Sequence, residues 1–212
     1  MLRLYLVRHG HTIWNDTGGV AGRTDIDLSK YGQEAVGALA QTLTAQVLLD
    51  SWYCSPLLRA RHTSQLLSTG ARIPAQRVTQ LPDVVIDDRL VELDFGDWEG
   101  MTWQDVHRHY QQEMDLWGKD WVNRSPPGGE SFAQQAVRCG DFLRELLSTS
   151  KKDRATMLVL HGGSIRALVC QCLGWSLSRA MDFSIDPATV TVVDLNRENN
   201  RWVVRKINAT GF

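Results

Sequence analysis

The sequence lacks the features that mark several large classes of protein. Its four cysteines are not spaced as zinc ligands, which favours reduced thiols and a cytoplasmic location. No apolar run reaches the length of a membrane span, and the N-terminus lacks the basic and apolar regions of a secretory signal. Acidic and basic residues nearly balance, with a net charge of −1, so no overall field attracts nucleic acid or a membrane surface. We therefore expect a cytoplasmic protein with a small-molecule substrate and with neither nucleic acid nor membrane as partner.

Repeats, low-complexity tracts and long linkers are also missing. The chain has 212 residues, enough for a substantial core, and nothing in it separates one part from another. Its apolar content of 43% and charged content of 22% are typical of a soluble globular protein. We expect a single domain spanning residues 1–212.

Strands alternate with helices along the chain, which predicts an α/β fold. The arrangement is a three-layer α/β/α sandwich with a mostly parallel central sheet. Ser29 is expected to cap one helix, and Ser55-Pro56 to begin the next. The remaining elements are strands at 4–7, 51–54, 84–87 and 157–160, helices at 102–117, 130–148 and 165–173, and a C-terminal hairpin of strands 189–195 and 202–207.

Two of the predicted strands end in a histidine followed by glycine. Leu4–Val7 leads into Arg8-His9-Gly10, and Met157–Leu160 leads into His161-Gly162. A single histidine at a strand end is more often a packing residue than a catalyst. Two strands that both end in His-Gly are harder to ascribe to packing, because ligands bind at the carboxyl ends of strands in open α/β sheets.

An anion site is the simplest interpretation of these strand ends. Arg8 adjoins His9, Arg59 falls in the first turn of the helix after the second strand, and Gly162 follows His161 at the start of another helix. Arginine binds phosphate through two parallel charge-assisted hydrogen bonds, and a helix N-terminus favours an anion. The cluster therefore predicts a pocket for a phosphoryl group.

These motifs together resemble the histidine phosphatase superfamily, also called the phosphoglycerate mutase-like superfamily. The resemblance covers nearly the whole chain and implies a phosphoglycerate mutase-like fold. It rests on Arg8-His9-Gly10, on Arg59 in Ser55–Ala60, on Glu92 before Phe95–Gly100, and on His161-Gly162.

The resemblance implies a role for each matching residue. His9 would be the nucleophile that carries a transient phosphohistidine, and Glu92 would protonate the leaving oxygen and then activate water. Arg8, Arg59 and His161 would hold the phosphoryl oxygens.

The resemblance also suggests substrate contacts for three further residues. Asn15 would add a phosphate contact. Arg23 and Thr24 fall where the family approaches the rest of the substrate.

Elementary chemistry supports a metal-free and cofactor-free reaction. A histidine nucleophile must be unprotonated, and neighbouring arginines disfavour the imidazolium. Phosphoryl transfer needs mainly positioning and charge stabilisation.

One departure from the family pattern is His11, where glutamate or glutamine is common. A metal site at His9 and His11 would need Asp25 or Asp27 as further ligands, and we expect no metal there.

Residues 100–130 form a helical insertion that covers the cleft in this family. Its Trp117–Trp121 spacing, with Phe95–Gly100 and Pro127–Ser131, resembles the bacterial α-ribazole-5′-phosphate phosphatases of cobalamin biosynthesis. Trp117 or Trp121 would then stack on a planar base, although a tryptophan at helical spacing is more often a core residue.

Three hypotheses follow from the sequence. The first is a phosphomonoesterase for α-ribazole 5′-phosphate, or for a related sugar or nucleotide phosphate. The second is a cofactor-dependent phosphoglycerate mutase, from which the chain differs by Phe95-Gly96 in place of Tyr-Gly and by a shorter insertion. The third is a non-catalytic phosphate-binding protein, which Glu92 argues against because binding alone needs no proton donor.

The C-terminal hairpin is compatible with a homodimer edge and equally with packing on its own sheet.

Overall fold

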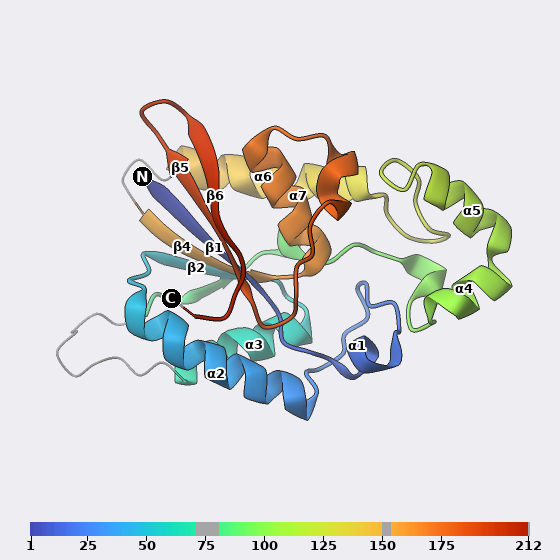
Figure 1. Cartoon of the computed structure of the whole chain (residues 1–212), viewed down its shortest axis with the longest axis horizontal. Coiled ribbons are helices and arrows are strands. Elements are labelled where there is room, and N and C mark those ends of the chain that lie inside the picture. Colours follow the sequence, from blue (N-terminus) through green and yellow to red (C-terminus); the bar gives the residue numbers. More distant parts are fainter. Residues whose placement is uncertain (71–80, 150–153, 212) are drawn as a thin grey trace.

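A six-stranded mixed sheet forms the centre of the protein, in the order β3-β2-β4-β1-β5-β6 (Figure 1). The computed structural model describes residues 1–70, 81–149 and 154–211. The first four strands of that order run parallel, and β5 lies antiparallel to both β1 and β6. The predicted α/β class is confirmed. The strands are β1 (Leu2–Arg8), β2 (Ser51–Cys54), β3 (Val84–Ile86), β4 (Arg154–Leu160), β5 (Val190–Asn196) and β6 (Arg201–Ala209).

A helix lies at or near each predicted position, and two of the predictions need correction. The segment expected as a single helix at 102–117 is two helices, because Tyr110 has φ −132° and ψ 40° and interrupts the helical hydrogen bonding. The α-helices are α1 (Ile13–Thr17), α2 (Lys30–Gln46), α3 (Leu58–Thr69), α4 (Trp103–His109), α5 (Gln111–Lys119), α6 (Phe132–Thr149) and α7 (Gly162–Leu173). Three 3₁₀ helices are η1 (Asp88–Leu90), η2 (Gly96–Trp98) and η3 (Leu177–Met181).

Successive side chains of a strand point to opposite faces of the sheet, so the core has two layers. Along β1, Leu4 and Leu6 face the core beneath α6 and α7, whereas Tyr5 and Val7 face the core beneath α2 and α3. Figure 1 shows these two helix pairs on opposite faces of the sheet. The three-layer α/β/α arrangement is thus built by side chains that alternate between two buried faces.

Close backbone contact fixes the loop after β1 against α2. Ser29 caps α2 as predicted, since its hydroxyl accepts a hydrogen bond from the Gly32 N–H at 3.1 Å. A Cβ on Gly32 would overlap the His11 carbonyl oxygen, and one on Gly10 would lie 2.8 Å from the Gly32 oxygen. Gly10 therefore allows close packing against a helix, and this packing holds the backbone next to His9.

The start of α3 differs from the Ser55-Pro56 prediction. The helix begins at Leu58, three residues after Ser55. The Asp25 carboxylate accepts a hydrogen bond from the Leu58 N–H at 2.5 Å, so the first turn is satisfied from another loop. The Ser55 hydroxyl lies instead 2.7 Å from the His161 ring.

The expected insertion carries α4 and α5, which lie beyond one end of the sheet (Figure 1). Trp98 and Val106 are buried in a small cluster here, and Trp117 packs against them. Trp121 packs on Phe132, with ring centroids 5.1 Å apart, and joins the main core. Both Trp117 and Trp121 are thus packing residues, in agreement with the core alternative.

The C-terminal hairpin is confirmed, with Asn200 in its turn at φ 51°. Trp202 and Val204 pack against the core, so the hairpin contacts its own sheet. Because β6 is an edge strand and Ile207 is 42% exposed, pairing with a second copy stays a prediction. Within the described ranges, no helix combines the length and the apolar character that a membrane span needs.

Two glycines of α2 offer a matched test of the backbone contact. Gly37→Ala should raise the free energy of unfolding by about 0.5–1 kcal/mol, because alanine favours a helix and nothing lies near its Cβ. Gly32→Ala should lower it by about 1–3 kcal/mol through overlap with His11. Urea unfolding of both variants measures the difference. Equal effects of the two substitutions would show that the loop does not constrain Gly32.

Candidate active site

The ends of β1 and β4 bring two histidines and an arginine together. These strands are parallel neighbours, with Arg8 opposite Leu160, and the His9 N–H donates to the Leu160 carbonyl at 3.0 Å. Both strands therefore finish at the same sheet edge. The His9 and His161 ring centroids lie 5.1 Å apart, and both side chains are buried.

Arg59 reaches this edge from the first turn of α3. Its Nε donates to His9 Nε2 at 3.3 Å, and the whole residue is excluded from solvent. Its terminal nitrogens donate to two loop carbonyls, those of Thr24 at 3.0 Å and Gly22 at 2.6 Å. A buried guanidinium needs such partners to offset lost hydration. The three contacts fix its orientation over His9.

Glu92 lies in the segment after η1 and interacts electrostatically with Arg8 and Arg59. Its carboxylate accepts hydrogen bonds from the Gly163 N–H at 3.0 Å and from the Gln135 amide at 2.9 Å. Gly163 lies in the first turn of α7, so the helix N-terminus expected to bind an anion already donates one N–H to Glu92. A Cβ on Gly163 would overlap Glu92 Oε1. Glycine is required there for the carboxylate to approach.

The electrostatics of the pocket keep both histidines neutral. Burial, followed by the charges of Arg59 and Arg8, lowers the pKa of His9 well below its usual value. Burial, Arg59 and His9 lower the pKa of His161 in the same way. His9 Nδ1 lies 2.7 Å from the Gly10 carbonyl, which can only accept. The ring proton is therefore on Nδ1, and Nε2 carries the lone pair that a nucleophile needs.

Two buried nitrogen atoms of the pocket have no hydrogen-bond partner among the described residues. They are Arg8 Nε and His161 Nδ1. Desolvation lowers the pKa of Arg8 to about 10, so this guanidinium is cationic at neutral pH. The pocket therefore combines the buried Arg59 and the half-buried Arg8 with neutral histidines, an arrangement suited to an anion with several oxygens.

The other predicted residues surround this centre. Gly162 lies beside Arg8, since a Cβ on it would be 3.6 Å from the guanidinium carbon. Thr24 lies on the loop held by Arg59, and the side chain of Arg23 forms an ion pair with Glu130 at 3.3 Å. Asn15 is exposed, and its amide oxygen accepts from the Thr12 N–H at 2.8 Å. Contacts of Asn15, Arg23 and Thr24 with substrate stay predictions.

His11 turns toward Tyr31, with ring centroids 5.0 Å apart in an edge-to-face arrangement. Across the described residues, no group of three histidine, cysteine, aspartate or glutamate side chains could hold a metal ion. The proposed independence from metal and cofactor stays a prediction.

Three residues of the site had no functional assignment from the sequence. Ser55, expected as a helix cap, contacts His161, and Gln135 orients Glu92. Glu99, which the sequence placed only within the motif Phe95–Gly100, accepts hydrogen bonds from the loop that holds Arg59. Sequence spacing could not reveal these roles, because each contact joins residues at least 43 positions apart.

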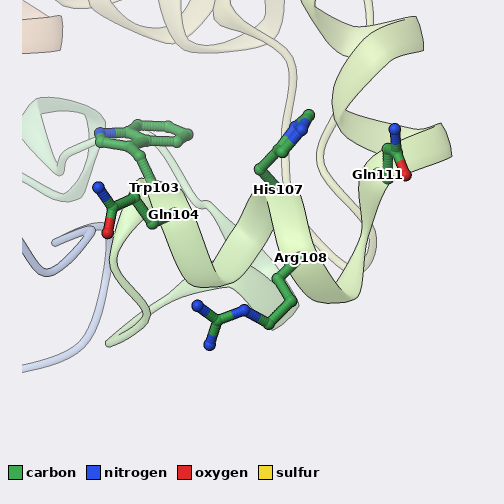
Figure 2. A pocket seen from close by; sticks show the side chains of 5 residues that line it. All are labelled: Trp103, Gln104, His107, Arg108 and Gln111. Atoms are coloured by element: carbon green, nitrogen blue, oxygen red, sulfur yellow. The ribbon is translucent and has the colours of Figure 1, made fainter.

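An open pocket of about 680 Å³ lies on the insertion (Figure 2). Trp103 and Gln104 lie on the first turn of α4, and Trp103 is 41% exposed. Its ring contacts Phe95, 5.8 Å away between centroids, in the segment that precedes Glu99. The remaining lining residues are His107, Arg108 and Gln111.

This fold and site define a class of phosphate-handling enzymes. The sequence profile of the histidine phosphatase superfamily (branch 1) matches residues 4–210. The chain belongs to that superfamily, and several of its relatives are named as phosphatases.

Two curated relatives differ in their substrates. Phosphoserine phosphatase 1 of Hydrogenobacter thermophilus is 32% identical over 210 residues, which cover 99% of this chain and 93% of that protein. Adenosylcobalamin/alpha-ribazole phosphatase of Escherichia coli is 28% identical over 197 residues, covering 93% and 92%. The class is thus shared, while the two named substrates are different.

Solved structures with the same fold are likewise named for different substrates. The alpha-ribazole phosphatase of Shigella flexneri superposes with a TM-score of 0.85 at 26% identity, covering 100% of this chain and 98% of that one. A mycobacterial glucosyl-3-phosphoglycerate phosphatase gives a TM-score of 0.81 at 28% identity, covering 99% and 100%.

The lowered pKa values of His9 and His161 predict acid lability. Both values lie below the roughly 6.5 of an unfolded histidine, so the unfolded state binds more protons in acid. Stability should therefore be retained above pH 6.5 and fall below it, by about 1.4 kcal/mol per pH unit for each histidine. Urea unfolding between pH 7 and pH 5 measures this slope.

A His9→Gln variant provides the control for that slope. It should lose the contribution of one histidine and show a flatter pH dependence than the wild type. An unchanged slope would mean that His9 is not held neutral by its surroundings.

Proposed function

We propose that this protein is a metal-independent phosphomonoesterase that forms a phosphohistidine on His9. The observation that supports it best is the neutral His9 imidazole, with Nε2 unprotonated and the Arg59 guanidinium 3.3 Å away. A lone pair beside a cation is what attack on a phosphate dianion requires. A non-catalytic binding protein would have no use for Glu92 in the same pocket.

The first half of the reaction transfers the phosphoryl group to His9. Nε2 attacks phosphorus and forms the N–P bond as the bond to the leaving oxygen breaks. Arg8, Arg59 and His161 stabilise charge on the phosphoryl oxygens. Glu92 gives its proton to the leaving oxygen, so the product departs as a neutral alcohol.

The second half returns the enzyme to its starting state. Glu92, now a carboxylate, takes a proton from water as the water oxygen attacks phosphorus. The N–P bond breaks, phosphate leaves, and the electron pair returns to His9 Nε2. One carboxyl group thus serves both steps, first as acid and then as base.

α-Ribazole 5′-phosphate is the substrate we propose. Support comes from the Escherichia coli and Shigella flexneri relatives named for alpha-ribazole, and from the exposed face of Trp103 in the insertion. A planar base can stack on an indole ring. Trp103 takes the place of Trp117 and Trp121 as the residue for this contact, since those two pack into clusters.

Phosphoserine is the second candidate. The Hydrogenobacter thermophilus relative named for it is 32% identical, against 28% for the Escherichia coli relative. A phosphoglycerate mutase is a weaker candidate, and it would depend on added 2,3-bisphosphoglycerate.

Phosphate release in EDTA tests activity and substrate together. We expect kcat/KM for α-ribazole 5′-phosphate to exceed the values for phosphoserine, 3-phosphoglycerate and p-nitrophenyl phosphate. Chelation should not change it, and His9→Ala should abolish turnover. A preference for phosphoserine would favour the second candidate, and substantial activity in His9→Ala would exclude the phosphohistidine.

A tryptophan pair controls for the proposed stacking. Trp103→Ala should raise KM for α-ribazole 5′-phosphate and leave that for p-nitrophenyl phosphate unchanged. Trp175→Ala, which removes a comparably exposed ring outside the insertion, should change neither. Equal losses on both substrates for Trp103→Ala would mean that the ring supports the fold of the insertion only.

Glu92→Gln tests the proton donor. The amide cannot donate to the leaving oxygen as an acid, so turnover of an alkyl phosphate should fall by roughly 10²–10⁴-fold. Phosphorylation of His9 by p-nitrophenyl phosphate should fall far less, because nitrophenolate leaves without a proton. Burst kinetics separate this step from hydrolysis of the phosphohistidine. Equal losses in the phosphorylation step for both substrates would remove Glu92 from the acid role.

A further inference from the structure

The loop Gly22–Thr24, here called the Arg59 loop, lies between a cation and a carboxylate. On one side, its carbonyls accept from the Arg59 guanidinium at 2.6 and 3.0 Å. On the other side, the Arg23 and Thr24 N–H groups each donate to Glu99 at 2.6 Å. The loop belongs to no helix or strand, so these side chains are what hold its backbone.

The Glu99 carboxylate is engaged almost completely. The Thr24 hydroxyl also donates to it, and so does the Phe95 N–H at 3.2 Å. It therefore links the Arg59 loop to the segment Phe95–Glu99, which directly precedes the insertion. A Cβ on Gly22 would overlap Glu99 Oε1, so glycine allows this approach. Four donors converge on one side chain, which is the pattern of a built contact.

The contact has a direct consequence for Arg59. A guanidinium has five N–H groups in a fixed plane, so two carbonyl partners and His9 define its orientation. The negative charge of Glu99 also favours the protonated form of this buried arginine, against the effect of desolvation on its pKa. Moving the loop would move the guanidinium relative to His9.

We propose that Glu99 is a positioning residue of the active site, which holds the Arg59 loop so that its carbonyls orient Arg59 across His9 Nε2. This inference rests on the proposed function of His9 and Arg59 in phosphoryl transfer. Glu99 itself does not touch the reacting atoms. It also couples the insertion to the catalytic centre, because Phe95 donates to the same carboxylate and contacts Trp103 of the insertion.

A double-mutant cycle with p-nitrophenyl phosphate tests the proposal. Glu99→Gln replaces one accepting oxygen by a donor, and a displaced Arg59 should lower kcat/KM by roughly 10²-fold. In an Arg59→Ala background the same substitution should change kcat/KM by less than about twofold, since no guanidinium remains to be positioned. If the fold-losses in kcat/KM of the two single variants multiply in the double variant, the proposal is wrong. It is also wrong if Glu99→Gln alone leaves kcat/KM unchanged.

Two controls separate positioning from general damage. Asp97→Asn changes an exposed carboxylate two residues away and should leave kcat/KM unchanged. Thermal unfolding reports whether Glu99→Gln is folded, and if it is not, Glu99→Asp serves in the same cycle because it keeps the charge on a shorter chain.

Binding of inorganic phosphate, measured by calorimetry, keeps the test independent of turnover. Glu99→Gln should weaken phosphate binding in the presence of Arg59 and not in its absence. If the wild type neither hydrolyses a phosphomonoester nor forms a phosphohistidine, the proposed function fails. Phosphate binding then still decides whether Glu99 acts through Arg59.

Discussion

Burial of a guanidinium against a neutral imidazole is the constraint on which the site depends. Arg59 is fully excluded from solvent, and its Nε lies 3.3 Å from His9 Nε2. Desolvation of a cation is costly unless each N–H finds a partner. The loop carbonyls of Gly22 and Thr24 supply two, and the carboxylate of Glu99 supplies compensating charge. The buried cation that lowers the pKa of His9 therefore requires an ordered loop and an anchored carboxylate.

The fold and the centre of the site could be predicted from the sequence because they depend on local pattern. The continuous apolar run Leu4–Val7 predicted a buried strand. A shared sheet edge for Arg8, His9 and His161 followed from two strands that each end in histidine and glycine. Arg59 followed from its place at the start of a predicted helix, Glu92 came from the family resemblance, and the structure brings both to this centre.

The parts that could not be predicted are contacts between distant segments. Ser55-Pro56 has the local form of a helix start, yet Asp25 satisfies the first turn of α3 and leaves the Ser55 hydroxyl to His161. The break at Tyr110 has no proline or glycine to mark it. Glu99 occurs in a loop of several acids, and only the tertiary structure separates it from the exposed Asp97. Long-range partners decided each case.

In the proposed reaction, catalysis and substrate choice reside in different parts of this chain. The proposed phosphoryl site is made by β1, β4, α3 and α7, elements of the sandwich, whereas the Trp103 pocket lies on α4 in the insertion. Relatives named for phosphoserine, alpha-ribazole and glucosyl-3-phosphoglycerate match 99–100% of this chain at 26–32% identity. A phosphoryl group presents the same oxygens in every substrate, so its site can stay constant while the insertion changes. The Phe95–Glu99 segment joins the two parts, because Glu99 holds the Arg59 loop and Phe95 contacts Trp103. A leaving group bound at the insertion can therefore influence the orientation of Arg59 without touching it.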